Sequence, residues 1–239
     1  MPAAPVVPYV DHIPTWIEAS SALLGGLSGA LTALRNRFDL SGILILAIVT
    51  GLGGGMLRDT LLQQGPPVAL TSAWLLPSAV AAGALVFLFS ETINTAHQHG
   101  ERLLILVDAV FLAVFAVVGT AKALGAGLPN VSCVLLGVLA GLGGGMLRDI
   151  LVNEQPELLR PGGVAGLAAV VGCTLQVVLV RQLGAPNSIG VAPMVVIIGI
   201  RIVAIWRGWE SPMATDMVQQ VQKIKIPRRR RRRRHPPDP

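Results

Sequence analysis

The feature that most constrains this chain is a nine-residue segment that occurs twice without a change. The sequence GLGGGMLRD occupies residues 51–59 and returns at residues 141–149, 90 positions later. In each copy a triple glycine lies in an apolar stretch and is followed by two adjacent residues of opposite charge. Glycine is about 1 kcal/mol less favourable than alanine in a helix, and a charge at the centre of a membrane span costs roughly 2.5–3.5 kcal/mol. A costly pattern repeated at a fixed spacing predicts a functional site.

The apolar composition indicates an integral membrane protein. Of the 239 residues, 52% are hydrophobic and only 13% are charged, whereas soluble domains carry about 25% charged residues. Apolar segments near the ~20 residues that cross a hydrocarbon core predict an all-α protein with seven transmembrane helices. We expect these helices at about residues 16–34, 40–62, 69–90, 102–124, 131–152, 161–181 and 189–207.

The 90-residue offset extends beyond the nine-residue segment and predicts an internal duplication. Glu18-Ala19 matches Asp108-Ala109, and Gly29 matches Gly119. Each copy holds three spans, an odd number, so the second copy enters the membrane from the opposite side and the repeat is inverted. The predicted organisation is an exposed N-terminal arm at 1–15, a first repeat at 16–90, a second at 102–181, a seventh helix at 189–207 and a polybasic tail at 208–239.

The positive charges outside the spans predict the orientation. Arg35, Arg37, Arg102, Arg160 and the tail all fall on one side if the N-terminus is outside and the C-terminus is cytoplasmic. The run Arg228–Arg234 favours contact with anionic lipid, at about 1 kcal/mol per charge near the surface. Nucleic-acid binding is not expected, because no aromatic residue follows Trp209 on which bases could stack.

The glycine triplets Gly53–Gly55 and Gly143–Gly145 have two interpretations. Small residues let membrane helices pack closely, which would be a purely structural role. Alternatively, each triplet bends or breaks its helix and turns bare carbonyls toward a polar cavity, which a membrane tolerates where protein or water lines it. The duplication together with the following charges favours the second interpretation.

The charged pairs Arg58-Asp59 and Arg148-Asp149 are expected to find partners elsewhere in the protein. Adjacent helical residues do not face each other, so an ion pair within each dipeptide is not expected. We predict pairing across the repeats, with Arg58 bound to Asp149, and Arg148 bound to Asp59 or to an acid of the first or fourth span. The alternative is that both pairs extend to opposite membrane interfaces.

Four further charges accompany these pairs. Glu18 and Asp108 are predicted near helix N-termini, where an acid either stabilises the helix dipole or attracts cations. Lys122 is expected at the end of its span, and Arg201 should face the bundle, pair with an acid or extend toward the cytoplasm. The sequence shows no nucleophile-base arrangement and no metal-ligand cluster, so neither an enzyme nor a cofactor or metal site is predicted.

These residues together resemble a known family. Besides the two GLGGGMLRD copies, the likeness rests on three short patterns, which are Arg35-x-Arg37-x-Asp39-x-x-Gly42, Gly119-Thr120-x-Lys122-Ala123, and Arg201 followed by Trp209 and Pro212. The chain resembles the bacterial branch of the trimeric intracellular cation channel (TRIC) superfamily, whose repeated unit is also described as a glycine-transporter domain. The likeness covers roughly residues 14–212.

The resemblance implies a homotrimer in the bacterial plasma membrane with a pathway inside each protomer. That pathway would run where the glycine-broken second and fifth spans meet the first and fourth, and it would conduct monovalent cations, mainly potassium. The residues implied to line it or lie near it are Gly53, Gly54, Gly55, Arg58, Asp59, Gly143, Gly144, Gly145, Arg148 and Asp149. The alternative is a secondary transporter for a small zwitterion such as glycine, with Arg58 or Arg148 binding the carboxylate.

Overall fold

The computed structural model describes residues 14–95, 97–159, 163–184 and 190–207, and every regular element in these ranges is helical. The elements are α1 Thr15–Arg35, α2 Leu40–Leu62, α3 Val68–Thr71, α4 Leu75–Leu88, α5 Ser90–Thr95, α6 His97–Gly125, α7 Asn130–Leu151, the 3-10 turn η1 Glu157–Leu159, α8 Ala165–Arg181 and α9 Val191–Arg207. The predicted arm at 1–15 lies almost wholly outside the described residues, as do Arg160 and the whole tail with Arg228–Arg234.

Each of the seven predicted ranges is occupied mainly by helix, and three of them differ from the observed helices. The range 69–90 is divided, because the chain leaves the helix between α3 and α4. The helix predicted from 102 begins at His97, and the one predicted from 161 begins at Ala165. Hydropathy marks the apolar part of a helix and does not register polar turns that extend it.

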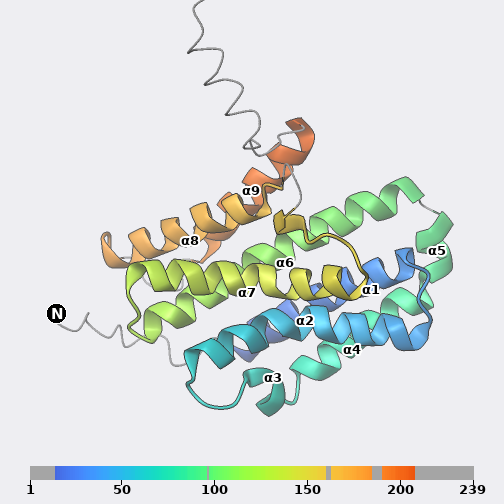
Figure 1. The fold of residues 1–239 in the computed structure, drawn as a ribbon, viewed down its shortest axis with the longest axis horizontal. Helices are drawn as coiled ribbons and strands as arrows, with labels where there is room; N and C mark the ends of the chain where they lie inside the picture. The colour runs from blue at the N-terminus through green and yellow to red at the C-terminus, as the bar shows by residue number, and fades with distance from the viewer. Residues whose placement is uncertain (1–13, 96, 160–162, 185–189, 208–239) are drawn as a thin grey trace, which may run out of the picture.

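Four helices are long and apolar enough to cross a membrane among the described residues, namely Thr15–Arg35, Leu40–Leu62, Leu104–Gly125 and Asn130–Leu151. The helices α4, α8 and α9 are shorter, at 14, 17 and 17 residues. The four long helices pack against one another in the middle of the molecule, α4 covers α1 and α2, and α8 and α9 cover α6 and α7 (Figure 1). The long helices therefore enclose the interior in which a site can lie.

The start of α2 shows how the sequence fixes a helix end. Asp39 is the N-cap, and its carboxylate accepts hydrogen bonds from the backbone N–H of Gly42 and from the Ser41 hydroxyl, each at 2.8 Å. These hydrogen bonds lower the pKa of Asp39, that from Gly42 having the largest effect. An N-cap carboxylate satisfies a backbone donor that has no partner inside the helix, so α2 begins at a defined residue.

The helices α2 and α7 lie side by side and run in opposite directions (Figure 1), and their contact is made by the glycine triplets. A Cβ added at Gly54 would collide with the carbonyl oxygen of Ala140, and one added at Gly144 would collide with the carbonyl oxygen of Thr50. Thr50 and Ala140 are themselves 90 positions apart, so the contact is reciprocal. Only glycine permits this approach of the two backbones.

Both helices remain α-helical through their triplets, so the predicted break at Gly53–Gly55 and at Gly143–Gly145 is wrong. Hydrogen bonding along the helix satisfies the backbone groups there, and close packing of α2 on α7 replaces the contacts that side chains would make. The packing interpretation accounts for Gly53 and Gly54 and for their counterparts Gly143 and Gly144.

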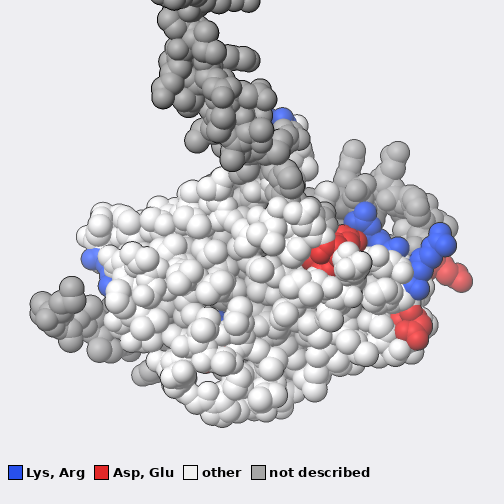
Figure 2. All heavy atoms as spheres, viewed as in Figure 1, with Lys and Arg blue, Asp and Glu red and all other residues white. Residues whose placement is uncertain are grey.

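The visible charges of the molecule gather at its ends. Figure 2 shows a broad face without charged side chains, with most acidic and basic residues at the end where α1 joins α2. Residues 35–39 of that connection, including Arg35 and Arg37, are exposed. An uncharged band between charged ends suits a chain that crosses a bilayer.

We expect Gly54→Ala to destabilise the protein by about 1–3 kcal/mol, because a methyl group at this contact overpacks the crossing of α2 and α7. Gly199→Ala on α9 is the matched control, since no atom lies within 4 Å of the position its Cβ would take. Thermal unfolding of the purified variants in detergent measures the difference. Equal unfolding temperatures for the two variants would contradict the role given to the crossing.

Candidate functional site

The first charged cluster joins α1, α2 and α6. The Arg58 Nε donates to Asp59 Oδ1 at 2.7 Å, and its Nη2 lies 3.4 Å from Glu18 Oε1. Lys122, from the last turn of α6, places its Nζ 2.5 Å from the same Glu18 oxygen and 3.7 Å from Asp59 Oδ1. Two carboxylates thus face two cations, and the Arg58 side chain is only 3% exposed.

The second charged cluster repeats this arrangement 90 positions later. The Arg148 Nε donates to Asp149 Oδ1 at 2.9 Å, and its Nη1 donates to Asp108 Oδ1 at 2.6 Å. Arg148 also donates to the hydroxyl of Ser28 on α1, and that hydroxyl donates to Asp108 Oδ1 at 2.9 Å. Asp108 corresponds to Glu18, so the two clusters share one plan.

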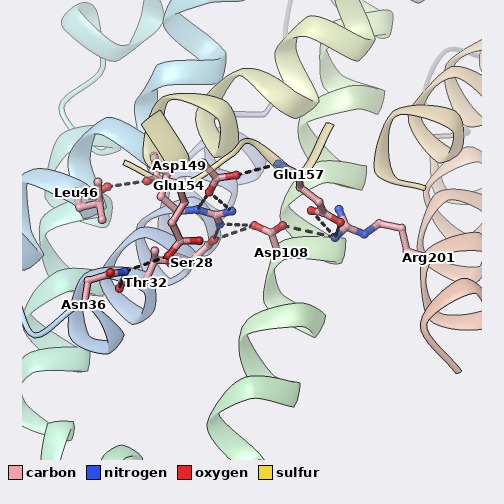
Figure 3. A network of polar contacts seen from close by, with 11 residues as sticks. Ser28, Thr32, Asn36, Leu46, Asp108, Asp149, Glu154, Glu157 and Arg201 are labelled. Carbon is pink, nitrogen blue, oxygen red and sulfur yellow. Dashed lines mark hydrogen bonds and ion pairs between the residues drawn. The ribbon is translucent and has the colours of Figure 1, made fainter. Parts of the chain in front are cut away.

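The second cluster extends farther than the first, to α9 and to the connection after α7. Arg201 on α9 lies 3.5 Å from Asp108 Oδ2, and its Nη2 donates to both oxygens of Glu157 at 2.8 and 2.9 Å. In Figure 3 Asp108 lies between Ser28 on one side and Arg201 on the other. Burial raises the pKa of Glu157, and the nearby Arg201 opposes that shift. Three carboxylates here face two arginines.

The aspartate of each motif has a second task, which is to hold the connection that follows its helix. Asp59 Oδ2 accepts a hydrogen bond from the Val68 backbone N–H at 3.0 Å, where α3 begins. Asp149 Oδ2 accepts one from the Glu157 backbone N–H at 3.1 Å, where η1 begins. In both copies one carboxylate oxygen binds the neighbouring arginine and the other fixes the returning chain.

These contacts correct the predicted pairing. Arg58 does not bind Asp149, and each arginine instead binds the aspartate next to it in sequence. Helical periodicity places adjacent Cβ atoms on different faces, but the arginine side chain is long enough for its guanidinium to return to its neighbour. The predicted pairing of Arg148 with an acid of the fourth span is confirmed by Asp108, and the predicted pairing of Arg201 with an acid by Glu157 and Asp108.

The positions of the supporting charges were predicted in part. Glu18 lies in the first turn of α1 and Lys122 in the last turn of α6, as expected. Asp108 does not lie at a helix start, because α6 begins eleven residues earlier at His97. It is stabilised by Arg148, Ser28 and Arg201 rather than by a helix dipole.

A small pocket lies beside each cluster, and the two pockets correspond. The first is bordered by residues that include Glu18, Gly51, Gly55, Arg58 and Asp59, and the second by their counterparts Asp108, Gly141, Gly145, Arg148 and Asp149. Each has a volume of about 20 Å³, enough for about one water molecule. The third glycine of each triplet therefore borders a pocket, whereas the first two pack at the crossing.

Sequence reasoning missed Ser28 and Glu157, which complete the second cluster. Ser28 lies on the small-residue face of α1 next to Gly25 and Gly29. The second copy has the apolar Val118 at the matching position, and this difference in polarity could have indicated a polar contact at Ser28. Glu157 lies in a connection between apolar segments, where an acid ordinarily remains solvated, so no sequence signal distinguished it from other loop acids. Among the described residues no group of three or more His, Cys, Asp or Glu side chains could hold a metal ion.

Comparison with known proteins places this geometry in a family. The model of the glycine transporter family matches the chain twice, at residues 15–91 and 105–181. A UPF0126 membrane protein of Deinococcus radiodurans is 40% identical over 158 residues, which are 66% of this chain and 72% of that protein. The UPF0126 inner membrane protein YadS of Escherichia coli K12 is 31% identical over 191 residues, covering 80% of this chain and 90% of the relative.

Solved structures agree with the sequence comparison. The TRIC trimeric intracellular cation channel orthologue from Rhodobacter sphaeroides superposes with a TM-score of 0.74 at 30% identity, covering 81% of this chain and 97% of that one. A structure of a prokaryotic TRIC channel in 0.5 M KCl gives 0.74 at 26% identity, with 81% and 96% coverage. The fold and the paired clusters define a multi-pass membrane protein with the TRIC channel fold. The chain belongs to the glycine transporter (TRIC) family.

We expect Arg201→Met to destabilise the protein, because it leaves Glu157 and Asp108 without this cation. Removing one partner of a buried pair costs about 3–5 kcal/mol, and the partial exposure of Glu157 favours the lower end of that range. Arg37→Met, at an exposed residue of the connection between α1 and α2, is the control. The double variant with Glu157→Gln should lose less stability than the sum of the two single losses, and additive losses in thermal unfolding would refute the pairing.

Proposed function

We propose that this chain is a channel for monovalent cations, with potassium the expected ion, and that its pathway runs inside each protomer between α1, α2, α6 and α7. The observation that carries the proposal is the pair of corresponding pockets, each bordered by a charged cluster and a glycine of the repeated motif. The TRIC fold supports the same class of protein, and a match to channel proteins favours a function without enzymatic chemistry.

The chemistry of the pockets favours cations. Glu18 and Asp59 border the first pocket, and Asp108, Asp149 and Glu157 border the second. In the second cluster the carboxylates outnumber the arginines, which favours a passing cation over an anion. Gly55 and Gly145 border the same pockets and add no side chain that would obstruct a passing ion.

The competing proposal is a glycine transporter, which the description of the matching family supports. One observation weighs against it. The carboxylate-binding role suggested for Arg148 meets competition, because its Nε, Nη1 and Nη2 already bind Asp149, Asp108 and Ser28.

The remaining architecture of the proposal follows from the duplication. Opposite directions of α2 and α7, their reciprocal glycine contact and the double family match support two inverted three-helix repeats, at 16–90 and 102–181, with α9 as a seventh span. Exposed Arg35 and Arg37 support a cytoplasmic position for the connection of α1 and α2, with the N-terminus outside. The trimeric state named for the Rhodobacter sphaeroides channel supports a homotrimer, and the tail Arg228–Arg234 would bind anionic lipid in the bacterial plasma membrane.

Flux into liposomes that contain the purified protein tests this function, with potassium and labelled glycine assayed in parallel. We expect potassium to move down its own gradient, to respond to voltage and to be unaffected by glycine. Asp108→Asn should lower the preference for potassium over chloride, whereas the control Glu91→Gln, at an exposed residue of α5, should not. Saturable glycine uptake without potassium conductance would establish the transporter instead.

A further inference from the structure

Two phenylalanine rings lie between the two pockets. Phe115 borders the first pocket and Phe111 borders the second. Their ring centroids are 4.8 Å apart, and the residues are 5% and 1% exposed. The wall that separates the two pockets is therefore, at this point, a pair of aromatic rings from a single helix, α6.

The surrounding glycines leave space for these rings. A Cβ added at Gly25 on α1 would lie 2.5 Å from the Phe111 ring, and one at Gly144 on α7 would lie 2.8 Å from it. The Phe115 ring would lie 3.4 Å from a Cβ at Gly54 and 3.5 Å from one at Gly55, both on α2. The rings thus fill the region where α1, α2 and α7 meet, beside the crossing of the two motifs.

The pair also departs from the duplication. At the matching positions the first copy has Ser21 and Gly25, a small polar residue and no side chain. The charged clusters, the glycine triplets and the pockets all follow the 90-residue offset, but this apolar wall does not.

We propose that Phe111 and Phe115 form the hydrophobic barrier that closes the pathway between the two pockets. The proposal rests on the proposed channel function and adds the position of its closure. Polar surroundings on both sides hold water and ions, whereas an apolar constriction between them excludes both by dewetting. Conduction then requires the two rings to move apart or turn out of the axis.

The first test is potassium flux through variants of the two phenylalanines. Phe115→Ala and Phe111→Ser, the latter taking the residue that the first copy has at this position, should each raise basal flux by roughly tenfold, which corresponds to lowering the barrier by about 1.4 kcal/mol. The control is Leu124→Ala, which removes a comparable buried side chain from the same helix inside a different core cluster. Phe111→Tyr keeps the aromatic ring and adds a hydroxyl that makes the barrier more polar, so it should also raise flux. Flux at the control level in all the phenylalanine variants would overturn the proposal.

A second readout does not depend on ion conduction. With Cys133 and Cys173 replaced by alanine, Ser21→Cys places a thiol beside the first pocket, and a charged, water-soluble thiol reagent is applied to either face of membrane vesicles. Labelling from one face only is expected while both phenylalanines are present, and labelling from both faces once Phe111→Ser and Phe115→Ala are added. Two-sided labelling with both phenylalanines intact would refute the barrier. If the protein conducts no potassium but the labelling changes as expected, the barrier stands and the channel function fails.

Discussion

The close approach of α2 and α7 is the constraint on which the rest of the structure depends. Gly54 lies against the Ala140 carbonyl and Gly144 against the Thr50 carbonyl, at separations that no other residue would allow. Because the contact is reciprocal and the helices are antiparallel, Arg58 and Arg148 extend from the crossing toward opposite ends of the molecule. Two pockets on either side of one crossing are the geometric result. A side chain on the central glycines would separate the helices and remove both.

Buried charge is the second constraint, and it explains why each charged side chain of the two clusters has an oppositely charged partner, although Arg201 Nη1 is buried without a hydrogen-bond partner among the described residues. An unpaired ion inside a membrane protein is strongly unfavourable, and attraction between partners offsets this only when hydrogen bonds satisfy the remaining groups. Each aspartate of the motif meets this demand with both oxygens, one bound to the adjacent arginine and one to a backbone N–H. The charged pairs therefore hold the connections to α3 and η1 in place as well as bordering the pockets.

The sequence was sufficient to predict what depends on hydropathy and on the 90-residue spacing. The helical class, the approximate ranges and the correspondence of Glu18 with Asp108 follow from those patterns alone. Contacts that depend on side-chain length and on three-dimensional packing did not follow. Arg58 returns to Asp59 because its guanidinium is at the end of a flexible chain, which helical periodicity does not describe. The triplets looked like helix breaks, because their intrinsic helix propensity is low, but close packing of α2 on α7 stabilises them as helix.

The departures from the duplication show where the two halves differ in mechanism. The first cluster takes its additional cation from Lys122 on α6, a helix of the second copy. The matching residue of the first copy is Thr32 on α1, which carries no charge. The second takes Arg201 from α9, which belongs to neither copy. The first cluster is thus held entirely by the two repeated units, and a displacement of α9 would act directly on the second cluster alone. Helix α6 supplies Asp108, Phe111, Phe115 and Lys122, and α1 supplies Glu18 to the first cluster, Ser28 to the second and Gly25 beside the Phe111 ring. These two helices touch both clusters and the wall between the pockets, so coupling between the two ends of the pathway has its shortest physical route along them.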